Sequence, residues 1–132
     1  MQPLLFDRGL PPAVADALLI LGLTAHAVGG DEAPAEDSMD EDNCKWCKNH
    51  GAILITNDRG KTNRDILDAL AQHHVHAVFV YDDLRSAPAH NLARALLVAE
   101  SKMDQLAKGR GLIHHRLGEN GTLRPRTKSK KR

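Results

Sequence analysis

Short apolar runs alternate along the chain with longer stretches in which apolar residues recur every three or four positions. The short runs are typical of buried strands, and the longer stretches of amphipathic helices. The pattern predicts strands at residues 3–6, 23–28, 52–56, 77–81 and 112–117. It predicts helices at residues 12–21, 38–50, 62–73 and 86–109. This alternation predicts an α/β fold in which helices cover both faces of a mostly parallel central sheet, in three layers.

Two helix starts carry the capping-box pattern, in which a hydroxyl residue is followed three places later by an acidic one. These pairs are Ser38 with Glu41 and Thr62 with Asp65. Gly51 stands where a helix C-terminus favours glycine. The capping signals therefore support helices that begin at Ser38 and Thr62.

A chain of 132 residues fits one domain, which we predict to span residues 1–123. Aromatic residues make up only 3% of the chain, so its core must be mainly aliphatic. No apolar run approaches the ~18 residues of a membrane span, and Asp7 and Arg8 interrupt the apolar N-terminal stretch that a signal peptide would need. We therefore expect a soluble, cytoplasmic protein without a membrane partner.

The formal charge of +1 hides a strong asymmetry. Six of the 18 basic residues follow Leu123 and no acidic residue does, so 12 basic and 17 acidic residues leave residues 1–123 at −5. We expect the basic tail, residues 124–132, to be solvated and disordered. The alternative is an arm that touches nucleic-acid phosphates.

Three aspartates lie where the predicted sheet would bring them to one edge. Asp7 directly follows the first strand, Asp58 follows the third, and Asp40 lies in the first turn of the helix before that third strand. Ligand sites of open α/β sheets lie outside the carboxyl ends of the strands. Clustered carboxylates hold hard cations such as Mg²⁺ and Mn²⁺. Each aspartate alone is also compatible with a turn or a helix-start role, and only their convergence favours a metal site.

These residues belong to motifs that resemble the PIN-like domains, whose best-known members are metal-dependent ribonuclease toxins of the VapC kind. Residues 4–11 look like the opening strand of that family with its first aspartate. Asp40, with Cys44 and Cys47 four and seven places later, is similar to its acidic helix start. Residues 53–58 look like its strand that ends in Thr-x-Asp.

The resemblance implies a three-layer PIN-like fold and a phosphodiesterase in which Asp7, Asp40 and Asp58 hold Mg²⁺ or Mn²⁺ that activates a water molecule. Thr56 would orient the aspartate or its water. The family usually has one more acid, for which Asp31 and Glu32 are the candidates. The implied function is a ribonuclease, the toxin of a type II toxin–antitoxin pair, with RNA as substrate, a cognate antitoxin as partner and a homodimer as assembly.

Basic residues flank the proposed acids and are candidates for neutralising RNA phosphates. They are Arg8, Arg59 and Lys61. Solvated surface positions are an equally good interpretation. Asp82 and Asp83, which follow the fourth strand, are second-rank candidates for the same sheet edge.

Two alternative functions stay open. One is a PIN-like module that has lost catalysis and only binds. The other is a phosphate-handling enzyme or receiver-like domain in which Asp58 accepts a phosphoryl group.

Cysteine and histidine residues also invite a zinc interpretation. Cys44, Cys47 and His50 offer three ligands on one helix, without a second pair at zinc-finger spacing, so small apolar residues facing the core are the favoured reading. His73, His74, His76, His114 and His115 are expected at the surface; RNA contact by His114 and His115 beside Arg116 is a weaker alternative.

Overall fold

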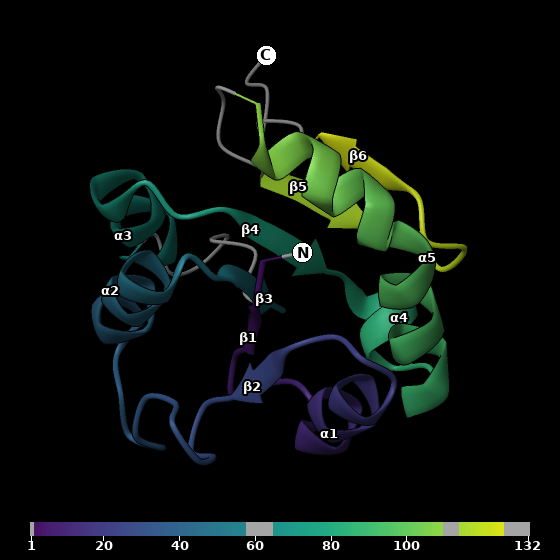
Figure 1. Ribbon diagram of the computed structural model, residues 1–132, viewed down its shortest axis with the longest axis horizontal. Coiled ribbons are helices and arrows are strands. Elements are labelled where there is room, and N and C mark those ends of the chain that lie inside the picture. The colour runs from purple at the N-terminus through teal and green to yellow at the C-terminus, as the bar shows by residue number, and fades with distance from the viewer. Residues whose placement is uncertain (1, 58–64, 110–113, 126–132) are drawn as a thin grey trace.

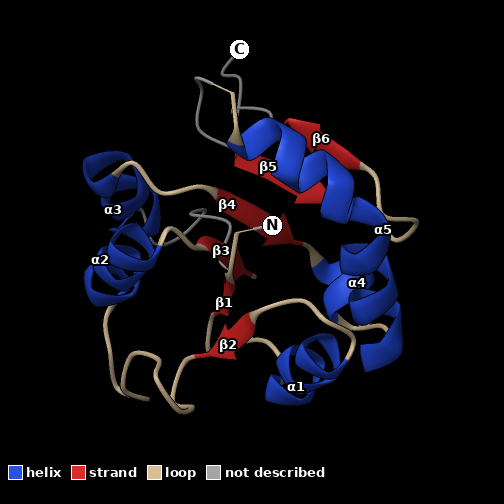
Figure 2. Cartoon of the chain, in the orientation of Figure 1, coloured by secondary structure: helices blue, strands red, loops and turns tan. Residues whose placement is uncertain are grey.

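The computed structural model describes residues 2–57, 65–109 and 114–125 of the chain. Its strands are β1 (Leu4–Phe6), β2 (Ala25–Ala27), β3 (Ile53–Thr56), β4 (Ala77–Val80), β5 (His114–Leu117) and β6 (Leu123–Pro125). Its helices are α1 (Pro12–Ile20), α2 (Asp40–His50), α3 (Asp65–His73), α4 (Asp82–Arg85) and α5 (Ala89–Ala107). Strands and helices alternate along most of the chain, as Figure 2 shows, so the predicted α/β class is confirmed.

The strands form one six-stranded sheet in the order β2-β1-β3-β4-β5-β6. Neighbouring strands from β2 through β5 pair in parallel, and β6 pairs antiparallel with β5. The mostly parallel sheet that the sequence predicts is therefore confirmed. The chain leaves β1 for β2 on one side and then crosses back to β3 on the other. In doubly wound sheets this reversal makes a crevice at the carboxyl ends of the two central strands, here β1 and β3.

Helices lie on both faces of the sheet (Figure 1), an arrangement compatible with a three-layer α/β fold. On one face α1 and α5 pack over a core that includes Phe6, Ile55 and Val80. On the other face α2 and α3 cover a second core that includes Leu5, Leu54 and Phe79. Successive residues of a strand point to opposite faces, which explains why the central strands are apolar at every position.

The start of α2 differs from the prediction. The helix begins at Asp40 and its N-cap is Met39, whose backbone N–H donates to Asp42 Oδ2 at 3.0 Å. Ser38 does not pair with Glu41; its hydroxyl instead donates to Asn43 Oδ1 at 2.6 Å. The predicted capping box was therefore wrong by one residue, because the buried amide of Asn43 attracts the serine. The Thr62 capping box lies outside the described residues.

The C-terminal part holds two elements that the periodicity did not predict. Helix α4 is a single turn between β4 and α5, too short to show a periodic pattern. Strand β6 includes Arg124 and Pro125, so the boundary predicted after residue 123 falls inside a strand. Proline lacks a backbone N–H and is tolerated at position 125 because β6 is an edge strand.

Within the part of the chain that the structure describes, no helix is both long and apolar enough to cross a membrane.

Candidate functional site

Asp7 and Thr56 meet at the carboxyl ends of β1 and β3. Asp7 directly follows β1, and its backbone N–H donates to the carbonyl oxygen of Ile55 at 2.9 Å. Thr56 ends β3, is fully buried, and donates its hydroxyl to Asp7 Oδ2 at 2.8 Å. The other carboxylate oxygen, Oδ1, accepts the backbone N–H of Arg8 at 2.8 Å. The carboxylate of Asp7 is thus held from two sides at the place where α/β sheets bind ligands.

Close contact between Gly9 and Asn57 holds the loop after β1 against the end of β3. A Cβ atom at position 9 would lie only 2.3 Å from Asn57 Oδ1, so the asparagine side chain occupies the space that a larger residue would need. Nothing in the sequence marks this contact, because only the parallel pairing of β1 with β3 brings Asn57 against Gly9.

Asp40 reaches this region from α2, of which it is the first residue. Burial, followed by the charges of Asp40, Asp7 and Glu41, raises the pKa of the Cys44 thiol to about 12. Two carboxylates from different elements therefore lie close enough to act on one thiol. Their combined negative potential is the kind that a bound cation relieves.

A buried polar pair stands behind Asp40. Asn43 is 2% exposed and Ser38 is 8% exposed, and the 2.6 Å hydrogen bond between them pairs the serine hydroxyl with the asparagine Oδ1 in the protein interior. Asp40, Asn43, Cys44 and Cys47 have the spacing of one helix face, so the signal for Asn43 was present in the sequence. It was missed because asparagine is usually exposed.

The basic candidates are described only in part. Arg8 is exposed, and its guanidinium donates to the carbonyl oxygen of Glu36 at 3.1 Å, which ties the β1–α1 loop to the loop before α2. This contact uses one of its five N–H donors. Arg59 and Lys61 lie outside the described residues.

The remaining acidic candidates are not all placed. Asp31 and Glu32 are exposed in the loop after β2, at the same carboxyl edge as Asp7. Asp83 lies in α4 and forms an ion pair with Arg116 at 3.3 Å. Asp58 lies outside the described residues. Within the described ranges, no group of three or more His, Cys, Asp or Glu side chains is arranged to hold a metal ion.

The donors that are described fit a hard divalent cation in kind. Asp7 is partly exposed, and each of its carboxylate oxygens retains lone-pair capacity beyond the single hydrogen bond given above. Asp40 is also partly exposed and supplies a second carboxylate. Oxygen ligands of this type suit Mg²⁺ and Mn²⁺ rather than softer metals.

The two cysteines of α2 pack in the protein core. Cys44 and Cys47 are free thiols, 0% and 1% exposed, and pack in the core under α2 and α3. Burial, followed by the charges of Cys44 and Asp7, raises the pKa of Cys47. His50 is exposed and stacks on Trp46 with ring centroids 4.0 Å apart. The prediction that the cysteines face the core is thus confirmed. His50 does not join them, because its ring stacks on Trp46.

The other histidines differ from the expectation of a surface position. His74 is exposed, but His73, His76, His114 and His115 are partly buried. His114 Nε2 lies 3.3 Å from the carbonyl oxygen of Val75, at the opposite end of the sheet from Asp7. The burial of His114 and His115 follows from their place in strand β5, which pairs with β4 on one side and β6 on the other.

No family model, curated protein or solved structure matches this chain.

Proposed function

We propose that this chain is a Mg²⁺- or Mn²⁺-dependent ribonuclease with a PIN-like fold, the toxin of a type II toxin–antitoxin pair. The observation that carries the proposal is the hydrogen bond from Thr56 to Asp7 at the reversal point of the sheet. The spacing of Asp7, Asp40 and Thr56 in the sequence and their approach from three different elements point in the same direction.

In this proposal Asp7, Asp40 and Asp58 hold the cation, which when bound supplies an activated water and stabilises the charge that develops on the phosphate. The hydroxyl of Thr56 fixes the orientation of the Asp7 carboxylate, as residues behind a metal ligand commonly do. Asp31 and Glu32 are the candidates for a further ligand from the loop after β2. Arg8, with Arg59 and Lys61, neutralises phosphates of the RNA next to the scissile bond.

Metal-dependent cleavage tests the proposal. Purified protein is incubated with labelled single-stranded and structured RNAs in Mg²⁺, in Mn²⁺ or in EDTA, beside Asp7→Asn and Asp16→Asn variants. Asp16 is an exposed acid on α1, so Asp16→Asn controls for loss of one surface charge. We expect cleavage that requires metal, is lost in Asp7→Asn and persists in Asp16→Asn. Equal cleavage by wild type and Asp7→Asn would refute the site.

Two further measurements test the alternative functions, a binding module without catalysis and a receiver-like domain. The first is metal binding, measured by calorimetry. Binding without cleavage of any RNA would favour a binding module that has lost catalysis. A receiver-like phosphotransfer domain is supported less well, because Tyr81 and Asp82 follow β4, and Gly118 and Glu119 follow β5, where such a site would use a serine or threonine and a lysine. Labelling of Asp58 by a small phosphodonor would favour it instead.

The partners of the proposed toxin are an antitoxin and a second copy of the chain. Three consecutive apolar residues at the end of α1 are exposed, namely Leu19, Ile20 and Leu21, at 55%, 85% and 61%. Exposed apolar residues in a continuous group are typical of contact surfaces. Light scattering of wild type and of Ile20→Lys tests whether this group supports a dimer.

A further inference from the structure

One row of residues crosses the sheet from the candidate site to its far edge. Thr56 is paired with Phe79, Phe79 with Arg116, and Arg116 with Arg124. At the other end of the row, Thr56 contacts Asp7 through its hydroxyl. Neighbouring strands are about 4.8 Å apart, so Arg116 lies about three strand spacings, or about 14 Å, from Asp7. Arg124 lies one spacing farther.

All members of the row lie on the same face of the sheet. Phe79 packs in the core beneath α2 and α3, and strand partners directly opposite each other share a face. Arg116 and Arg124 therefore lie on that face, whereas Leu117 and Leu123 pack against the core on the α5 side. Both arginines are exposed, so the α2–α3 layer does not cover this part of the sheet.

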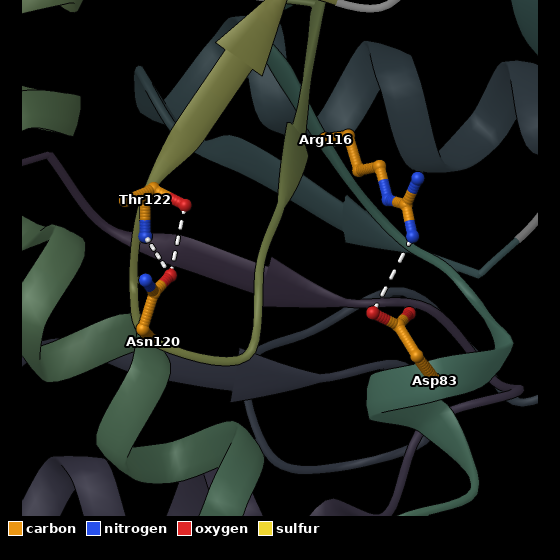
Figure 3. Close-up of polar contacts among 4 residues, drawn as sticks. All are labelled: Asp83, Arg116, Asn120 and Thr122. Atoms are coloured by element: carbon orange, nitrogen blue, oxygen red, sulfur yellow. Dashed lines mark hydrogen bonds and ion pairs between the residues drawn. The ribbon is translucent and has the colours of Figure 1, made fainter.

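Arg116 is held in a fixed position by two contacts, one of which Figure 3 shows. Its guanidinium lies 4.4 Å from the centre of the Tyr81 ring and 3.3 Å from Asp83 Oδ2. Tyr81 follows β4 at the same carboxyl edge as Asp7, so the guanidinium is directed toward the candidate site. The remaining N–H donors of a guanidinium match phosphate oxygens.

A shallow hollow of about 360 Å³ lies beside the two arginines. It is lined by Arg116, Gly118, Glu119, Asn120, Thr122 and Arg124. The turn that forms its end is stabilised by Asn120 Oδ1, which accepts the Thr122 hydroxyl at 2.9 Å and the Thr122 backbone N–H at 3.3 Å (Figure 3). Gly121 fits there because its α-carbon lies against Val98 of α5, where a Cβ atom would come within 2.5 Å. The turn of the β5–β6 hairpin is therefore held against α5, and this fixes the backbone that carries Arg116 and Arg124.

We propose that the open face of the β5–β6 hairpin is a phosphate-binding subsite for single-stranded RNA, formed by Arg116 and Arg124. Thr56 and Phe79, in the middle of the row, are buried under α2 and α3, so the RNA passes along the carboxyl edge of the sheet, with the phosphate at Asp7 at one end and the arginine pair at the other. This assignment rests on the proposed ribonuclease function for the identity of the polymer. The sequence continues from Pro125 with five basic and no acidic residues, which extends the positive charge beyond the pair.

Binding without cleavage tests the subsite. The full chain is titrated in EDTA with a short, fluorescently labelled single-stranded oligouridylate, and anisotropy is recorded over a range of salt concentrations. Arg116→Gln and Arg124→Gln are compared with Arg94→Gln, which removes an exposed arginine from α5 on the opposite face. Arg124→Lys keeps the charge, and circular dichroism establishes that each variant is folded.

We expect weaker binding by Arg116→Gln and Arg124→Gln, with the slope of log affinity against log salt reduced by about 0.7 for each lost phosphate contact. Arg94→Gln is expected to bind as wild type, and Arg124→Lys to retain the wild-type slope. An unchanged slope in both hairpin variants, or an equal loss in Arg94→Gln, would overturn the subsite. Because no metal is present, either result is independent of whether Asp7→Asn abolishes cleavage, so failure of the subsite and failure of the ribonuclease assignment are distinguishable.

Discussion

The hydroxyl of Thr56 donates to the carboxylate of Asp7 across 2.8 Å, joining residues 49 positions apart in the chain. The threonine is fully buried and the aspartate is partly exposed, so the bond connects the interior of the sheet to its ligand-binding edge. A carboxylate held in this way needs little reorganisation when a cation binds.

Removal of the Thr56 hydroxyl should weaken both the fold and the site. Thr56→Val keeps the shape but loses a hydrogen bond to a charged group, which we expect to cost about 1.5 kcal/mol of unfolding free energy in urea. Metal affinity should fall about 10- to 100-fold, as is usual when a residue that orients a ligand is lost. Thr56→Ser keeps the hydroxyl and should retain metal affinity. Equal affinity in Thr56→Val and wild type would contradict the positioning role.

Gly9 and Asn57 should be energetically coupled. Gly9→Ala places a methyl group where Asn57 Oδ1 lies, 2.3 Å from the new Cβ atom, and we expect a loss of about 1 kcal/mol. In an Asn57→Ala background the same change should cost clearly less, because the obstructing amide is gone. A double-mutant cycle of urea unfolding measures the coupling. Strictly additive costs would mean that the two side chains do not compete for this space.

Ser38 should matter through Asn43 and not as a helix cap. Ser38→Ala leaves the amide oxygen of a residue that is 2% exposed without its hydroxyl donor, and we expect a loss of about 1–3 kcal/mol in unfolding free energy. Asp42→Ala serves as the comparison, since Asp42 is exposed and its carboxylate accepts the backbone N–H of the N-cap Met39. A larger loss in Asp42→Ala would show that capping dominates here.

The buried thiols should make stability fall at alkaline pH. The pKa of Cys44 is raised to about 12 in the folded protein, mainly by burial, whereas an unfolded thiol ionises near about 8.5. The unfolded state therefore releases this proton first, and stability present below about pH 8.5 declines as the pH rises. We expect Cys44→Ala to flatten the decline between about pH 8.5 and about pH 10 in urea unfolding. A thiol reagent should react slowly with the native protein and rapidly in denaturant; rapid reaction with native protein would contradict the burial.

Two histidines should destabilise the fold in acid. Burial lowers the pKa of His76 and of His115, and the charge of His114 acts in the same direction on both, with Lys102 adding to the effect on His115. The unfolded chain therefore takes up protons first, and stability present at neutral pH is lost as the pH falls below about 6.5. We expect His115→Gln to show a smaller loss than wild type between about pH 7.5 and about pH 5.5. His90→Gln, at an exposed position, should behave as wild type.

Local pattern alone determined much of the fold. The apolar runs at β1, β3 and β4 and the helical spacing of α1, α2, α3 and α5 are visible in the sequence, because strands buried on both faces are apolar at every position and helices buried on one face repeat about every 3.6 residues. The position of Asp7 after a strand and of Asp40 at a helix start follows from the same reading. Strand β6 was missed because Arg124 and Pro125 are exposed at the edge of the sheet, so it shows no apolar run, and α4 was missed because a single turn shows no helical period.

Only the tertiary structure decided which residues meet. The strand order places β1 beside β3, and this brings Thr56 to Asp7 and Asn57 over Gly9. The same pairing carries the row of residues on to Arg116. Neighbours in a sheet are chosen by long-range packing and by the path of the crossover helices, which the periodicity of a single segment does not encode. The sequence thus determined the elements and the kinds of chemistry that they carry, while the packing of distant segments decided where that chemistry converges.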